Sequence, residues 1–198
     1  MAKTLFDVCT LTEGTRSTDT ISITVGNRFD DELCMEERLL INSEYALLRG
    51  SQDSGFPGLL REVNIMAVRK IDKGALQILC SGILEEYRKN AVFLMNAVTL
   101  HEISLSIGHG SEGIRALEDG FRFMEVPILL TDAMPCIAEG RVPILYGDFS
   151  KVRVEDCGYD KLQQESYKDK SDVRKYSMTG YLNCVLEDKQ SLLGMKIV

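Results

Sequence analysis

The chain has 198 residues, a formal net charge of -7, and 44% of its residues are hydrophobic. This length suits one domain, or one domain with lobes, and the apolar content is ordinary for a globular protein. The acidity argues against a protein that grips nucleic acid in general, because such a protein presents a basic stripe to the phosphates. No apolar run reaches the roughly 20 residues that a membrane-spanning helix needs, so we expect no membrane partner.

The cysteines are spaced too widely for a metal knuckle or a C-x-x-C redox pair. They are Cys9, Cys34, Cys80, Cys136, Cys157 and Cys184. A chain of this length does not need a disulfide scaffold, and we expect no signal peptide. We therefore expect buried, reduced thiols and neither a metal nor another cofactor.

The first 26 residues predict a long hairpin with a polar tip. Leu5–Leu11 is strand-like, 12–18 is rich in turn residues around Gly14, and 20–25 alternates apolar and polar residues. Because the segment has little to pack on both of its faces, we expect it to project from the rest. A hairpin without its own core is also expected to become ordered only on contact with a partner.

A long helix is predicted from about Arg28 to Arg49. Asn27 is suited to cap it, acidic residues follow in the first turn, and Gly50 supplies the C-terminal glycine. Its expected apolar stripe consists of Phe29, Leu33, Leu40, Ile41, Tyr45, Leu47 and Leu48. We expect this stripe to lie along a sheet or lobe.

The middle of the chain alternates short strands with capped helices. Val63–Val68 predicts a short strand, and the fully apolar run Ala91–Met95 predicts a central one. Asp72 and Asn96 stand where a helix N-cap is expected, and the two helical patterns extend to about residues 87 and 107. This order of elements predicts an α+β or mixed α/β fold.

The last third of the chain alternates apolar runs with turn residues. Phe123–Leu130 and Val142–Tyr146 each predict a buried strand, and the second leads directly into Gly147–Ser150. Lys151–Glu155 alternates like a half-buried strand. The mixed charges of Asp160–Lys175 predict a solvated strand or loop face, or a polar rim where subunits meet.

One glycine pattern leaves an enzyme open as an alternative. Gly108–Gly113 matches G-x-G-x-x-G, and Asp132 lies at a suitable distance to meet a ribose. A dinucleotide loop must follow a strand and open a helix. Residues 103–107 could be that strand, but Asn96–Ile107 fits a helix equally well, and Gly120 interrupts the next helical pattern. We therefore favour a surface loop here and keep a small nucleotide-binding enzyme as the alternative.

The two histidines give no catalytic or metal motif. His101-Glu-Ile-Ser-Leu lacks the second histidine of H-E-x-x-H, and His109 has no cysteine close to it in the sequence. A Cys–His nucleophile pair stays possible because its members need only meet in space, but no spacing favours it.

Several short motifs, taken in order, resemble the major capsid proteins of tailed phages of the Hong Kong 97 type. Asn42–Gly50, followed by Phe56–Leu60, is similar to the end of that family's long spine helix and the turn after it. Ala91–Asn96 resembles a strand-to-helix step in which Ala97 replaces the usual proline.

Three further motifs extend the resemblance to the end of the chain. Phe123–Leu130 with Pro127 resembles a family strand in which Val126 replaces a glycine. Gly147–Phe149 matches the family's G-D-F turn, and Tyr176–Val198 is similar to its closing strands. The chain starts where the hairpin is expected, which fits a short or minimal member, a cleaved mature form or a divergent relative.

The resemblance implies an α+β capsid fold with an N-terminal extended hairpin at 1–26. It implies a peripheral lobe (27–70 and 150–183) built on the spine helix and an antiparallel sheet. It also implies an axial lobe (71–149 and 184–198) with a mixed sheet and flanking helices. The implied function is structural, not enzymatic: self-assembly of pentamers and hexamers into an icosahedral shell around double-stranded phage DNA, without sequence-specific binding.

The implied partners are other copies of the chain and the portal, scaffolding or decoration proteins of the same virus. The implied location is the virion capsid, assembled in the host bacterial cytoplasm. An encapsulin-like nanocompartment shell, with cargo enzymes in place of DNA, is the alternative within the fold. No asparagine lies between Asn96 and Asn183, so Gln163–Ser177 offers no acceptor for the isopeptide bond of some members. We therefore expect non-covalent assembly over many symmetric contacts.

The candidate residues for structure and assembly follow from the hairpin tip, the matched motifs and the polar stretch. They are Thr12, Gly14, Arg16, Asp19, Pro127, Gly147, Asp148, Phe149, Lys168, Asp169 and Lys170. No catalytic, cofactor-binding or metal-binding residue is predicted.

Overall fold

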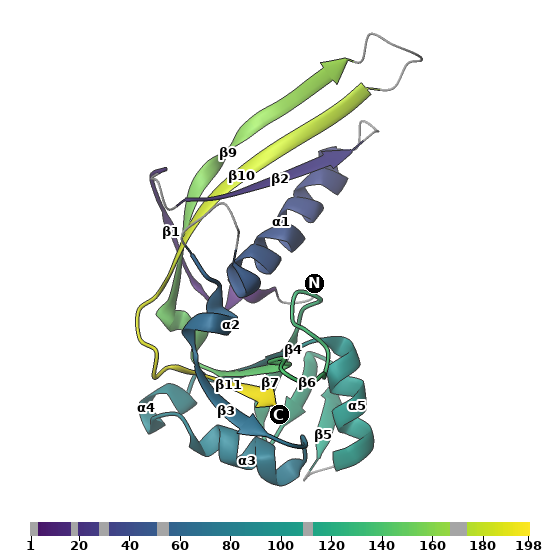
Figure 1. Cartoon of the computed structure of the whole chain (residues 1–198), viewed down its shortest axis with the longest axis vertical. Helices are drawn as coiled ribbons and strands as arrows, with labels where there is room; N and C mark the ends of the chain where they lie inside the picture. The colour runs from purple at the N-terminus through teal and green to yellow at the C-terminus, as the bar shows by residue number, and fades with distance from the viewer. Residues whose placement is uncertain (1–3, 17–19, 28–31, 51–55, 109–112, 167–173) are drawn as a thin grey trace.

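A computed structural model of the chain describes residues 4–16, 20–27, 32–50, 56–108, 113–166 and 174–198. In these residues the strands form two sheets, which lie one above the other along the long axis of the molecule (Figure 1). The first sheet has four strands in the order β1 (Thr10–Glu13), β9 (Val152–Ser166), β10 (Arg174–Leu186) and β2 (Ile21–Asn27). With the helices described below, this arrangement confirms the predicted α+β class.

The N-terminal hairpin prediction is wrong. β1 pairs in parallel with β9, and β2 pairs antiparallel with β10, so the two strands lie at opposite edges of the sheet. Between them β9 and β10 form a long antiparallel pair. The pair takes in the half-buried strand predicted at Lys151–Glu155 and parts of the stretch Asp160–Lys175, for which a solvated strand or loop was predicted. The N-terminal segment also contributes to the core, because Leu5 in the 3-10 turn η1 (Leu5–Asp7) and Ile21 are fully buried and Ile23 nearly so.

Helix α1 (Glu32–Arg49) packs against β2 and β10. It ends as predicted, at Gly50, whose φ of +81° suits glycine and whose N–H donates to Ala46 O at 2.8 Å. The predicted start at 28–31 lies outside the described residues. The predicted stripe is only partly correct: Leu47 and Leu48 are fully buried, whereas the side chains of Leu40 and Ile41 are 41% and 50% exposed.

The second sheet has seven strands among the described residues. Their order is β3 (Asn64–Val68), β11 (Leu192–Ile197), β8 (Ile144–Gly147), β4 (Val92–Met95), β7 (Val126–Leu130), β6 (Gly120–Phe123) and β5 (Ile114–Leu117). β4 is a central strand, as predicted, with β7 parallel on one side and β8 antiparallel on the other. Its side chains alternate, so that Phe93 and Met95 face one core and Leu94 faces another.

The helices of this half begin at the predicted caps. Asp72 accepts from Ala75 N at 2.8 Å and starts α3 (Lys73–Ser81); Asn96 accepts from Val98 N at 2.8 Å and starts α5 (Ala97–Ile107). The first helical pattern is split, because α3 ends at the cap residue Gly82 and the short α4 (Glu85–Arg88) follows.

The strand predicted at 123–130 is confirmed from Val126 to Leu130, and a hairpin turn separates this strand from the one before it. β6 ends at Phe123, and β7 begins at Val126. Met124 and Glu125 make the turn with φ values of +48° and +66°. Two central residues with positive φ are the geometry of a tight hairpin turn, here without the usual glycine or asparagine.

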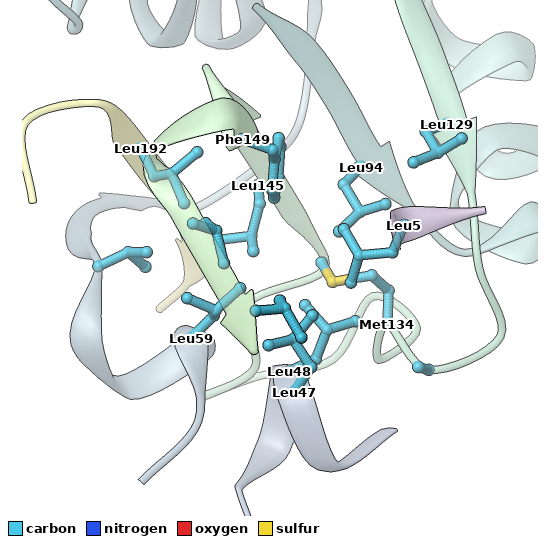
Figure 2. Packing of buried hydrophobic residues seen from close by; sticks show 14 of the residues in the cluster. Leu5, Leu47, Leu48, Leu59, Leu94, Leu129, Met134, Leu145, Phe149 and Leu192 are labelled. Atoms are coloured by element: carbon cyan, nitrogen blue, oxygen red, sulfur yellow. The ribbon is translucent and has the colours of Figure 1, made fainter. Parts of the chain in front are cut away.

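One hydrophobic cluster joins the two sheets, and we call it the junction core (Figure 2). Leu94, Leu129, Leu145 and Leu192 come from one face of the seven-stranded sheet, and Leu47 and Leu48 from α1. Val152, Val154 and Leu182 come from the four-stranded sheet, and Leu59 from α2 (Leu59–Glu62). A second core lies on the other face of the seven-stranded sheet, under α3 and α5. Because the sheets share the junction core, neither buries its apolar surface alone.

Candidate assembly surface

The G-D-F turn connects the two sheets, since it joins β8 to β9 through the 3-10 turn η2 (Phe149–Lys151). Gly147 has a φ of +146°, and a Cβ there would lie 2.0 Å from Ser191 O. Asp148 is buried; its N–H donates to Ser191 O and its carboxylate accepts from Ser150 N, both at 3.0 Å. Phe149 is buried in the junction core.

These three predicted residues therefore lie inside the subunit, not on its surface. Only glycine fits at Gly147, because both the backbone conformation and the space exclude a side chain. The Asp148 side chain closes the turn as a cap does. Any effect of these residues on assembly must act through the connection between the sheets.

Thr12 and Gly14 lie along the edge made by β1. Thr12 is exposed and pairs in register with Glu155. Gly14 N donates to Asp156 O at 2.9 Å, and a Cβ on Gly14 would lie 2.7 Å from Glu155 Cβ. The glycine therefore lets the N-terminal segment lie directly against β9.

Arg16 holds the same segment against the long hairpin. Its Nη2 lies 3.0 Å from Asp160 Oδ1, and its Cζ lies 3.6 Å from the centre of the Tyr181 ring. Tyr181 donates its hydroxyl to Asp160 Oδ2 at 2.6 Å. The hydrogen bond from Tyr181, and then that from Arg16, hold the pKa of Asp160 below its ordinary value. Polar contacts thus link the N-terminal segment, β9 and β10 at the surface.

The other predicted residues do not join this cluster. Pro127 is exposed on β7, where it pairs in register with Arg122 of β6. The remaining candidates, Asp19, Lys168, Asp169 and Lys170, lie outside the described residues. Whether any candidate contacts another subunit stays a prediction.

An apolar groove beside the first sheet was not predicted. Its volume is about 590 Å³, and its lining includes Phe6, Leu11, Leu39, Leu40, Val154, Tyr159 and Leu182. Leu11, Leu40 and Tyr159 are 57%, 41% and 64% exposed. Clustered apolar surface of this kind marks protein interaction sites, so the groove is the best candidate for contact with another chain.

The sequence held one signal for this groove. Leu39, Leu40 and Ile41 follow one another on α1, and successive helical residues turn by about 100°. Three successive apolar residues therefore spread over about 200° of the helix surface, more than one flat sheet can cover. Leu39 is part-buried against the junction core, while Leu40 and Ile41 stay exposed.

The glycine pattern at 108–113 has the reverse of the context that dinucleotide binding needs. Gly108 ends helix α5 with a φ of +82°, and the strand β5 begins at Ile114. A dinucleotide loop follows a strand and opens a helix. The enzyme alternative based on this loop is therefore wrong.

The cysteine side chains that the structure describes are free, and four of the five are partly buried. Cys136 is exposed, contrary to expectation. Burial raises the pKa of the Cys9 thiol to about 12 and also raises that of Cys184, which disfavours the reactive thiolate. His101 is exposed on α5. No group of side chains that could hold a metal ion, and no helix long and apolar enough to cross a membrane, occurs in the described part of the chain.

Comparison with known proteins agrees with this architecture. The model of the phage capsid family matches residues 36–197. The curated proteins gave no match. Among solved structures, the chain is similar to the capsid of an empty GTA particle computed with C5 symmetry. That alignment has a TM-score of 0.69 and 17% identity, and covers 98% of this chain and 89% of that one.

Two other solved structures share the fold. One is from Gordonia phage Cozz, with a TM-score of 0.64 and 15% identity over 90% of this chain and 70% of that one. The other is the holo-SrpI encapsulin complex from Synechococcus elongatus PCC 7942, with a TM-score of 0.60 and 13% identity over 89% and 72%. The family match spans well over half of the sequence, and the sheets and helices agree with it. The chain therefore belongs to the phage capsid family and is a capsid shell protein.

Proposed function

We propose that copies of this chain assemble into pentamers and hexamers that close into an icosahedral shell around double-stranded phage DNA. The family match over residues 36–197 carries this proposal. The net charge of -7 is consistent with it, because a strongly basic lining would hold the packaged DNA too tightly. The role is structural, not enzymatic.

The apolar groove supports contact between copies. A single subunit leaves Leu11, Leu40 and Tyr159 substantially exposed, and a neighbouring copy would remove this surface from water. A head-to-tail contact of this kind closes into a ring when the rotation per subunit allows it. Many weak contacts of one type then add up to a stable shell.

We assign one lobe of the proposed shell subunit to each of the two sheets: the peripheral lobe to the four-stranded sheet and the axial lobe to the seven-stranded sheet. The peripheral lobe would then include β1 and β2 from residues 1–26, and β10 as far as Leu186. β3, predicted in the peripheral part, would belong to the axial lobe with the seven-stranded sheet. Portal, scaffolding and decoration proteins are the further partners we propose, and assembly would occur in the host cytoplasm.

The contents of the shells test the proposal. Particles produced with the other proteins of the same virus are treated with nuclease, purified and opened. We expect double-stranded DNA protected from the nuclease. An encapsulin-like shell is the second candidate, supported by the similarity to the encapsulin structure. Particles that hold a protein cargo and no protected DNA would favour that candidate.

A further inference from the structure

Glu44 is a buried carboxylate at the junction of the two sheets. Its side chain lies on α1, and the residue is 9% exposed. Oε1 accepts a hydrogen bond from Leu5 N at 2.8 Å, and Oε2 accepts one from Thr131 Oγ1 at 2.6 Å. One side chain therefore links α1 to the N-terminal segment and to the residue that follows β7.

Neighbouring residues of α1 hold the same stretch after β7. Tyr45 donates its hydroxyl to Asp132 O at 2.8 Å, and Arg49 Nε donates to Ala133 O at 2.9 Å. Thr131 Oγ1 also accepts from Ala133 N at 3.2 Å. Of these α1 residues, Glu44 is the one that also binds the N-terminal segment through Leu5.

Burying a carboxyl group is costly, and a leucine would fill the space at a lower cost. The side chain of Glu44 instead makes two hydrogen bonds of defined geometry. These bonds fix two segments of the chain at defined positions relative to α1. The surrounding junction core is apolar, and the hydrophobic effect that holds it together is non-directional. The two hydrogen bonds of Glu44 therefore supply a direction that the leucines around it cannot.

We propose that Glu44 is a positioning residue that locks the N-terminal segment and residues 131–133 onto α1, and so fixes the orientation of the two sheets. In a shell, that orientation sets the angle at which one subunit meets the next. The effect on the shell rests on the proposed function, whereas the lock within the subunit does not.

Hydrogen exchange of the full-length subunit tests the lock. Glu44→Leu keeps the approximate volume and removes both acceptors, so we expect the amides of Leu5 and Ala133 to exchange about tenfold faster or more. Glu44→Gln should restore protection, because its oxygen can accept from Leu5 N and its amide can donate to Thr131 Oγ1. Glu102→Leu, at an exposed carboxylate of α5, is the matched control and should change neither amide.

A milder variant keeps the test decisive if Glu44→Leu does not fold. Thr131→Val removes the donor to Glu44 Oε2, but it also removes the acceptor of the Ala133 amide. In this variant the Leu5 amide therefore reports on Glu44, and its exchange should become faster. Unchanged exchange at both amides in Glu44→Leu, or at Leu5 in Thr131→Val if only that variant folds, would overturn the lock.

Particle diameters then test the consequence for the shell. We expect Glu44→Leu to give a broader distribution of diameters than wild type, and Glu44→Gln to give the wild-type distribution. Identical diameters despite faster exchange would overturn the control of orientation. A wild-type chain that never assembles would contradict the proposed function, while the exchange result would still decide the lock.

Discussion

Gly147 illustrates how one residue determines the connection between the sheets. Its φ of +146° and the 2.0 Å approach of Ser191 O to a built Cβ are independent obstacles to any side chain. Gly140 has only the first obstacle, because its φ is +74° and a Cβ there would meet nothing within 4 Å. The two glycines therefore separate backbone strain from steric clash.

We predict that Gly147→Ala destabilises the subunit by at least about 3 kcal/mol, or prevents folding. Gly140→Ala should lower the free energy of unfolding by about 1–2 kcal/mol, because only the backbone conformation is unfavourable there. Urea unfolding of both variants measures the difference. Equal costs at the two positions would contradict the close approach at Gly147.

Asp160 should make stability depend on pH. The hydrogen bond from Tyr181, followed by that from Arg16, lowers the pKa of Asp160 from its ordinary value of 3.8 in the folded state. A carboxyl whose folded pKa is lowered stabilises the fold above its unfolded pKa, and this contribution is lost as the pH falls through the folded pKa. The affected range lies below about pH 5.

We predict that Asp160→Asn makes the loss of stability between about pH 5 and pH 2 shallower than in wild type. Urea unfolding at a series of pH values measures this slope. Glu118→Gln, at an exposed carboxyl group, is the control and should leave the slope near that of wild type. A slope in Asp160→Asn that equals the wild-type slope would contradict the Arg16–Asp160–Tyr181 cluster.

Local signals at single residues were largely sufficient for the helix ends. Asp72 and Asn96 were predicted as caps from their residue types and positions before helical patterns. The structure confirms both, because each accepts a hydrogen bond from an amide two or three residues further along the chain. The turn at Met124–Glu125 was missed because neither residue type is associated with positive φ. The strand pairing on both sides forces that conformation, and such a constraint is not local.

At the scale of elements, the N-terminal strands show the limit of pattern reading. The alternation at 20–25 correctly placed β2, but alternation does not identify the strand that pairs with it. β1 and β2 are close in sequence, so a hairpin was the simplest prediction. Instead each pairs with a different strand of the β9–β10 hairpin, more than a hundred residues away in the chain.

Truncation of a β2 side chain tests whether this segment belongs to the core. Ile21 is fully buried in the junction core, so we predict that Ile21→Ala lowers the free energy of unfolding by about 2–5 kcal/mol. Ser22→Ala, at the exposed neighbouring position, should change it by less than about 0.5 kcal/mol. Similar small effects for both variants would mean that the segment does not pack as described.

The groove makes a prediction for α1. Leu40 is 41% exposed in the single subunit, so Leu40→Gln should leave the unfolding midpoint close to wild type. If a neighbouring copy covers the groove, the concentration needed for assembly should rise on the order of tenfold. Light scattering over a dilution series measures that concentration.

A matched leucine separates the groove from general surface polarity. Leu105→Gln on α5 changes a side chain that is 73% exposed and does not line the groove. We expect it to assemble at the wild-type concentration. If Leu40→Gln also assembles at the wild-type concentration, the groove is not a contact between copies of the chain.

At the scale of the whole molecule, the order of the motifs was enough to predict the family. Single motifs were a poorer guide to the role of their residues in assembly. Gly147–Phe149 and the step at Asn96 lie between elements where the family pattern expects them. The apolar run on α1 was not enough to predict the groove, because its lining comes from the N-terminal segment, α1, β9 and β10, which only the fold brings together. Lys168, Asp169 and Lys170 lie outside the described residues, so their predicted role at a polar rim stays a prediction.

The size of the purified protein in solution, measured by light scattering with electron microscopy of the same sample, tests the central claim most directly. We predict rings of five or six subunits, or closed shells tens of nanometres across as a rough scale set by many repeated contacts. A chain that remains a monomer or dimer at high concentration, with its folded state intact, would contradict the claim that it builds a shell by itself.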